Sequence, residues 1–84
     1  MTYSVILAGQ AEEQVATLPR PGLVAYLAAH VEIAIDPWSG RPAGDDDEGR
    51  MRTITFGPEG QGLAVFLVLE RDERVYVVKV VWAG

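Results

Sequence analysis

Two apolar runs separated by a short charged break dominate the C-terminal third of the sequence. Residues 63–69 carry no polar side chain, and residues 75–82 carry one charge, at Lys79. Runs of this length that are rich in Val, Phe, Tyr and Trp predict the two antiparallel strands of a hairpin. Because the first run does not alternate with polar residues, we expect a central strand covered on both faces. On a regular strand the second run places these residues on one face: Val75, Val77, Lys79 and Val81.

The rest of the chain predicts two helices flanked by strands. Residues 2–8 alternate as a strand, and residues 51–56 alternate again, so both segments are expected in the sheet. Ala11, Val15 and Leu18 recur at helical spacing and predict a short amphipathic helix. The resulting order is βααβββ. We therefore expect an α+β protein, with an antiparallel sheet and a two-helix hairpin packed on one of its faces.

The second helix is expected to start at residue 23 and to end at Asp36-Pro37. The segment Pro19-Arg20-Pro21-Gly22 reads as a sharp break before it, and a residue that precedes proline leaves the α region. Tyr26, His30 and Glu32 are expected toward the edges of this helix. One apolar stripe is predicted to face the sheet: Leu23, Leu27, Val31 and Ala34.

Composition limits the classes of function. The 84 residues predict one domain, spanning residues 1–84, with a modest core. The formal net charge of −5 argues against nucleic-acid binding by bulk charge, because phosphate contacts need clustered Lys and Arg. The absence of cysteine excludes thiolate zinc sites and thiol nucleophiles. No apolar run approaches the roughly 18 residues that span a bilayer. We therefore expect a cytoplasmic protein with no membrane segment, no cofactor and no metal.

The order of the elements and the proline-containing breaks between them resemble those of the RelE/ParE toxin family of bacterial type II toxin–antitoxin systems. A Leu-Pro break lies between the helices, and Asp-Pro follows the second helix. The matching segments cover nearly the whole chain and read TYSVILAGQAEEQVATLP, DPWSGRP, MRTITFG and GLAVFLVLERDERVYVVKVV. The resemblance implies a small antiparallel sheet with two helices on one face. It also implies a cognate antitoxin as partner.

Two activities follow from this resemblance. RelE-like members are mRNA interferases that cleave messenger RNA, usually on the ribosome, whereas ParE-like members inhibit DNA gyrase; such modules are associated with plasmid stabilisation. RelE-type nucleases carry basic residues on the central strands and near the C-terminus. This acidic chain lacks most of them, with the family's arginine falling near Ala64 and the C-terminal segment reading Trp82-Ala83-Gly84. The chain therefore resembles a divergent member of the RelE/ParE family, one that lacks most of the family's basic catalytic residues.

Arg50 and Arg52 are the positions that match the family's basic pattern, and they are the candidate catalytic residues. Two arginines can bind a phosphate, although the pattern places no general base beside them. The alternative is that both balance the preceding acidic loop, as surface charge clusters usually do. That loop contains Asp45, Asp46, Asp47 and Glu48. Its consecutive acids lack the alternate spacing of calcium loops, which favours a solvated loop over a cation site.

The remaining candidates favour structural roles. His30 is the single histidine and a potential general base, but its apolar helix favours a boundary position. Trp38 and Trp82 are potential binding aromatics for which packing is favoured. Three carboxylates, Glu70, Asp72 and Glu73, lie beside arginines in the predicted hairpin turn. This position favours a solvated turn over a paired-acid site.

Two functional hypotheses remain open from the sequence. The first is a toxin-like component that cleaves messenger RNA as a RelE-type endoribonuclease or inhibits gyrase, and that an antitoxin neutralises. The alternative is a catalytically silent protein-binding module of the same fold. A homodimer is also plausible, because long apolar strands in so small a chain leave surface that two short helices cannot cover.

Overall fold

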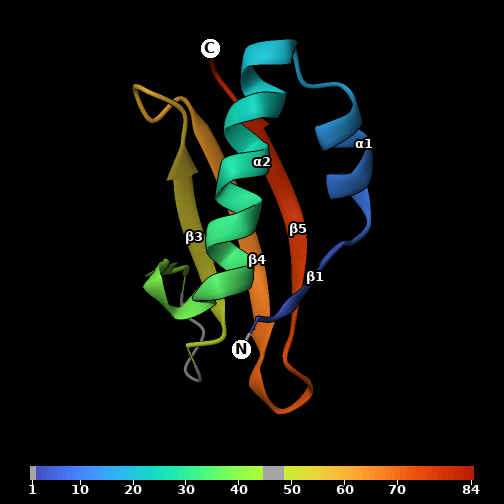
Figure 1. Ribbon diagram of the computed structural model, residues 1–84, viewed down its shortest axis with the longest axis vertical. Coiled ribbons are helices and arrows are strands. Elements are labelled where there is room, and N and C mark those ends of the chain that lie inside the picture. The colour runs from blue at the N-terminus through green and yellow to red at the C-terminus, as the bar shows by residue number, and fades with distance from the viewer. Residues whose placement is uncertain (1, 45–48) are drawn as a thin grey trace.

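The computed structural model describes residues 2–44 and 49–84 and shows one five-stranded sheet with two helices against it (Figure 1). Short 3-10 turns occupy Pro37–Ser39 and Glu70–Asp72. The elements, in chain order, are β1 (Ser4–Leu7), α1 (Gln10–Ala16), α2 (Arg20–Ile35), β2 (Arg41–Pro42), β3 (Met51–Phe56), β4 (Gly62–Leu69) and β5 (Arg74–Trp82).

The strand order across the sheet is β1-β5-β4-β3-β2. The predicted α+β class and its two helices are confirmed, and the predicted βααβββ order holds with one short strand, β2, added after the helices. The sheet differs from the expected one at its two edges. At one edge, β1 pairs with β5 in parallel, because the intervening chain returns to that edge through the helices and the other strands. At the opposite edge, two residues of the expected loop form β2 and pair with β3.

Strand β5 does not keep a regular alternation along its length. Val65 pairs with Lys79 and the next residue, Phe66, pairs with Val77, so β5 carries one extra residue at Val78. A bulge of this kind changes which side chains share a face. Val75, Val77 and Val80 are buried, whereas Lys79 and Val81 are exposed. The predicted single face holding Val75, Val77, Lys79 and Val81 is therefore wrong beyond Val77.

Strand β4 lies between β5 and β3, as expected of a central strand, but one face of it is uncovered. Its buried residues alternate with more exposed ones along the whole strand. The buried side chains of both helices belong to one cluster with the buried face of β4 and β5. Both helices therefore cover the same face, and Leu63, Val65 and Leu67 lie on the helix-free face.

Helix α2 begins earlier than expected, at Arg20. A proline is tolerated in the first turn of a helix because its missing N–H would have no intrahelical partner there. Pro21 therefore lies inside the helix, and the break between the helices is confined to residues 17–19. Gly22 faces the indole of Trp82, where an added Cβ would lie 3.0 Å from the ring.

The face that α2 turns to the sheet is the opposite of the predicted one. Tyr26 and Ile33 are each 1% exposed, and Ala29 is buried between them. Of the residues expected in the core stripe, Leu23, Leu27 and Val31 are instead exposed, and Ala34 is half-buried. The physical reason is that α2 is apolar nearly all round, so close approach decides its orientation. Gly22, Ala25 and Ala29 let the backbone approach the sheet, which larger side chains would prevent.

Three aromatic rings connect α2 to the sheet. Tyr26 meets Phe56 edge to face at 5.7 Å between centroids, and Phe56 stacks on Trp82 at 5.9 Å. Gly62 makes room for this cluster, because a Cβ there would overlap the Phe56 ring. Such geometries add to the stabilisation from area burial. The helix is thereby fixed over the end of β3.

The orientation of α2 can be tested by removing one large side chain from each face. Ile33→Ala should lower the free energy of unfolding by about 2–5 kcal/mol, because it leaves a cavity in the core. Leu27→Ala should change it by no more than about 0.5 kcal/mol, because Leu27 is exposed. Urea unfolding at low protein concentration, where association does not contribute, measures both. A larger cost for Leu27→Ala would contradict this orientation.

Candidate functional site

Arg52 lies on β3 with its guanidinium enclosed by the chain that follows α2. Its Nε donates to the carbonyl oxygen of Gly49 at 3.1 Å. Its Nη1 donates to the carbonyl oxygens of Gly40 at 2.8 Å and Trp38 at 3.5 Å. The guanidinium carbon also lies 5.0 Å from the centroid of the Trp38 ring, a cation–π distance.

This arrangement gives Arg52 a structural task. The residues that bind it come from both sides of a long connection, so the side chain fastens that connection to the sheet. Gly40 is held against the strand so closely that an added Cβ would lie 2.8 Å from the carbonyl oxygen of Thr53. Trp38 is anchored in addition by its Nε1, which donates to the hydroxyl of Tyr3 at 3.4 Å. The sequence-based expectation of packing for Trp38 agrees with these contacts.

Arg50 lies immediately before β3 and is exposed. Its carbonyl oxygen accepts a hydrogen bond from the Val68 N–H at 2.8 Å, which extends the β3–β4 ladder. The two candidate catalytic arginines are thus neighbours in sequence with different surroundings, one exposed and one half-buried against carbonyl groups. Their catalytic role remains a prediction. The predicted acidic partners, residues 45–48, lie outside the described residues.

The single histidine, His30, is hydrogen-bonded to a buried tyrosine of the core. Tyr26 and His30 are one turn apart on α2, and the Tyr26 hydroxyl lies 3.0 Å from Nδ1 of His30. Burial lowers the pKa of His30 and raises the pKa of Tyr26 to about 12. The two groups therefore share one hydrogen bond, with the donor set by the tautomer of neutral His30. The prediction that Tyr26 lies at a helix edge is wrong, and the i, i+4 spacing of the two residues was the available signal.

The other candidates occupy structural positions. Trp82 packs in the aromatic cluster, as expected. Glu70, Asp72 and Glu73 are exposed at the turn between β4 and β5, where Glu73 adopts a left-handed conformation with φ 50°. Within residues 2–44 and 49–84, no group of three or more His, Asp or Glu side chains is arranged to hold a metal ion. No helix of that same part of the chain is long and apolar enough to cross a membrane.

The helix-free face of the sheet is mostly apolar. Leu63 and Val81 are exposed hydrophobic residues on its central strands, and Ile6 is exposed on β1. Among the described residues, the positive charge of this face comes from Lys79 and Arg74 on β5 and from Arg41 on β2, whose partner Thr53 is in turn paired with Val65. Aliphatic side chains do not bind phosphate, so the central strands offer little to an RNA backbone. They do offer a surface suited to protein contact.

Solved structures with a similar architecture include RelE toxins, alone and in complexes with RelB. The isolated E. coli RelE toxin is similar with a TM-score of 0.80 and 17% identity, over 98% of this chain and 85% of that chain. A chain of the intact E. coli RelBE toxin–antitoxin complex gives a TM-score of 0.79 and 18% identity, over 98% of both chains. A chain of the archaeal RelE–RelB complex from Pyrococcus horikoshii gives a TM-score of 0.72 and 17% identity, over 100% of this chain and 98% of that chain.

The chain has a RelE-like fold. These identities are low, so the likeness concerns the fold. No protein-family model matches the sequence, and no curated protein matches it either. The likeness is therefore one of overall architecture rather than of closely shared residues.

The structural task of Arg52 predicts a loss of stability on its removal. Arg52→Ala should lower the free energy of unfolding by about 1–3 kcal/mol, because carbonyl oxygens lose a charged donor. Arg52→Lys should recover only part of the loss, because an ammonium cannot reproduce the planar fork over the indole. Arg74→Ala, which removes an exposed arginine, is the matched control. Urea unfolding of the three variants checks this, and equal stability of Arg52→Ala and Arg74→Ala would contradict it.

The lowered pKa of His30 predicts a dependence of stability on pH. The unfolded chain takes up a proton near the usual histidine pKa of about 6.5, whereas the folded protein takes it up at lower pH. Stability should therefore fall as pH drops from about 7.5 to 5.5, in addition to any carboxylate contribution. His30→Gln should remove that part of the fall. Urea unfolding at the two pH values measures it, and an unchanged pH dependence in His30→Gln would show that His30 is not responsible.

Proposed function

We propose that this protein is a toxin-like component of a two-protein toxin–antitoxin system, and that it acts by binding a protein rather than by cutting RNA. The likeness to RelE toxins supports the first part, because two of the similar structures are complexes of a RelE with a RelB antitoxin. The partner that neutralises this chain is accordingly an antitoxin protein. The system would operate in the cytoplasm, with the whole chain acting as one domain.

The engagement of Arg52 carries the choice of binding over cleavage. Its Nε and Nη1 donate to carbonyl oxygens of its own chain, which favours a structural role for this guanidinium over stabilising the charge that develops on a phosphate. His30 shares its Nδ1 with Tyr26 beside the core, whereas the contacts of Arg52 are with Trp38, Gly40 and Gly49. The helix-free face adds apolar contact area, and its basic side chains, Arg41, Lys79 and Arg74, lie on β2 and β5 rather than on β3 and β4. Inhibition of gyrase, or silent binding of a partner, requires only such surface.

Cleavage of messenger RNA on the ribosome is the second candidate. The exposed position of Arg50 beside the start of β3 supports it, because a phosphate can approach an exposed guanidinium. In that mechanism Arg50 and Arg52 would hold the scissile phosphate. The two candidates differ in what they predict for cellular transcripts.

Induction of this chain alone in a bacterial host separates the two activities. We expect growth to arrest while messenger RNA stays intact, because the arrest would come from protein binding. Arg50→Ala should not relieve the arrest, and neither should Arg71→Ala, a matched change at an exposed arginine in the turn between β4 and β5. Growth curves with transcript integrity followed in parallel provide the measurement.

Each other outcome has a defined meaning. Cut transcripts that become intact in Arg50→Ala, with Arg71→Ala still cutting, would overturn the binding proposal in favour of the nuclease. Normal growth with soluble, folded protein would overturn the toxin role and leave the silent binding module. Arg52→Lys, rather than Arg52→Ala, is the appropriate second variant because it retains positive charge at the strand.

A further inference from the structure

Helix α2 presents a second apolar surface, on the side away from the sheet. Val24 is 60% exposed, Leu27 53%, Val31 56% and Ile35 61%. Aliphatic side chains exposed to this degree in one contiguous stripe are costly to leave in water. The stripe lies opposite Tyr26 and the other buried residues of the helix, so the fold of the single chain leaves it unused.

The exposed surface consists of two parallel ridges formed by residues four apart. The first ridge carries a charge at each end and a small residue in the middle. The second ridge is large and aliphatic throughout. The first is Arg20, Val24, Ala28 and Glu32, and the second is Leu23, Leu27, Val31 and Ile35.

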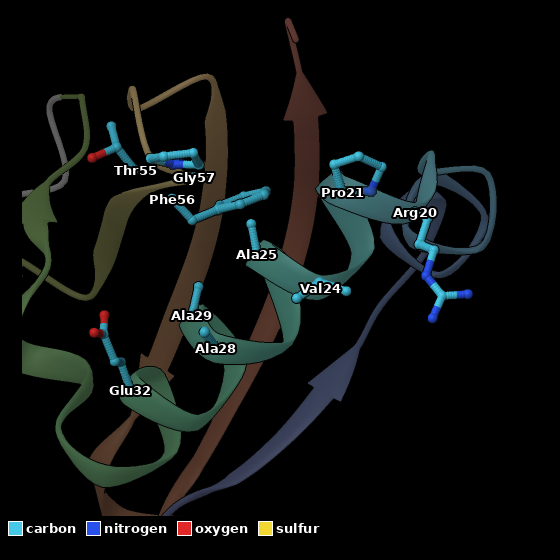
Figure 2. Close-up of a pocket in the computed structure, with 11 residues that line it drawn as sticks. Arg20, Pro21, Val24, Ala25, Ala28, Ala29, Glu32, Thr55, Phe56 and Gly57 are labelled. Carbon is cyan, nitrogen blue, oxygen red and sulfur yellow. The ribbon is translucent and has the colours of Figure 1, made fainter.

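A groove runs beside the first ridge, between α2 and the end of β3 (Figure 2). It has a volume of about 780 Å³. Its helical wall is low because Ala25, Ala28 and Ala29 form it, and Phe56 and Pro58 belong to its opposite side. Arg20 and Glu32 mark its two ends. A large aliphatic ridge from another helix fits a groove of this shape better than a small or polar one.

We propose that the occupant is a second copy of this chain, docked through α2 in an antiparallel, two-fold arrangement. A two-fold axis between Leu27 and Ala28 places the second ridge of each copy against the first ridge of the other. Val24 then lies opposite Val31, and the large side chain of Leu27 meets the small Ala28. Such an interface closes on itself and uses the same patch twice.

Charge complementarity fixes the direction of the two helices. In the antiparallel arrangement Arg20 of one copy lies opposite Ile35 of the other, and Glu32 of that other copy is offset by about 4.5 Å along the helix axis, so the two long charged side chains can approach each other. The two-fold axis forms this ion pair twice. A parallel arrangement would instead place Arg20 beside Arg20 and Glu32 beside Glu32, which is repulsive. This inference is independent of the proposed function, because it requires neither an antitoxin nor a cellular target.

Sedimentation velocity of the full chain, from low to high micromolar concentration, tests the dimer. We expect a monomer–dimer equilibrium that Leu27→Glu weakens about tenfold or more, because it places a carboxylate in the apolar contact. Val81→Glu is the matched control, since Val81 is exposed on the helix-free face of the sheet. It should leave the equilibrium unchanged, and the urea midpoints of both variants verify that they fold.

A charge exchange tests the pairing separately from the apolar contact. Arg20→Glu and Glu32→Arg should each weaken the dimer, and the double variant should restore it. Neither change opposes the helix dipole, because an acid is placed at the N-terminus of α2 and a base near its C-terminus. The folded monomer should therefore tolerate both.

Single cysteines report the register, because the chain has no cysteine of its own. With a short thiol cross-linker, Leu27→Cys should give covalent dimers, since the two copies of position 27 lie near the two-fold axis. Ile35→Cys should not, because its two copies would be about 22 Å apart along the axis. A parallel dimer would cross-link at both positions and overturn the arrangement.

Three results would overturn the proposal as a whole. One is a monomer at every concentration. Another is a dimer that Val81→Glu breaks and Leu27→Glu leaves intact, which would assign the contact to the sheet. The third is a chain that stays monomeric alone and uses Leu27 only to bind an antitoxin, which would assign the stripe to a different protein.

Discussion

The close approach of α2 to the sheet is the constraint on which the rest of the structure depends. Gly22, Ala25 and Ala29 remove the bulk that would keep the helix away, and Tyr26 and Ile33 fill the space that remains. Phe56 and Trp82 complete the packing from the strand side. Because small residues on one face allow a closer and better-packed contact, the larger aliphatic residues are left outside. The exposed stripe of α2 is thus a consequence of how the core is packed.

Arg52 shows that an arginine in a RelE-like fold can bind backbone carbonyl oxygens of its own chain. A guanidinium offers five donors in a planar fork, which suits phosphate and also suits a set of carbonyl oxygens. Here it holds the connection after α2 against β3 through Gly40, Gly49 and Trp38. A RelE-like fold therefore does not by itself assign this arginine to catalysis, since function depends on the groups that surround a residue.

The two uncovered surfaces lie on opposite sides of the molecule. One is the helix-free face of the sheet, with Leu63 and Val81, and the other is the outer stripe of α2, with Leu27 and Val31. The α2 stripe is symmetric about its middle, which suits a second copy of the chain. The sheet face contains Lys79, Arg74 and Arg41 among its apolar residues and has no such internal symmetry. A protein with both surfaces can bind a partner on one side while it pairs with itself on the other.

The sequence by itself determined the α+β class, the order of the elements and the central place of β4. These follow from local periodicity and from glycine and proline, which act within a few residues of chain. Only the tertiary structure decided which face of α2 is buried, because a helix that is apolar nearly all round carries no directional signal. The parallel β1–β5 pair, the shift of register beyond Val77 and the contacts of Arg52 were also decided at that level. Each depends on groups distant in sequence, whose packing and hydrogen bonds exist only once the chain is folded.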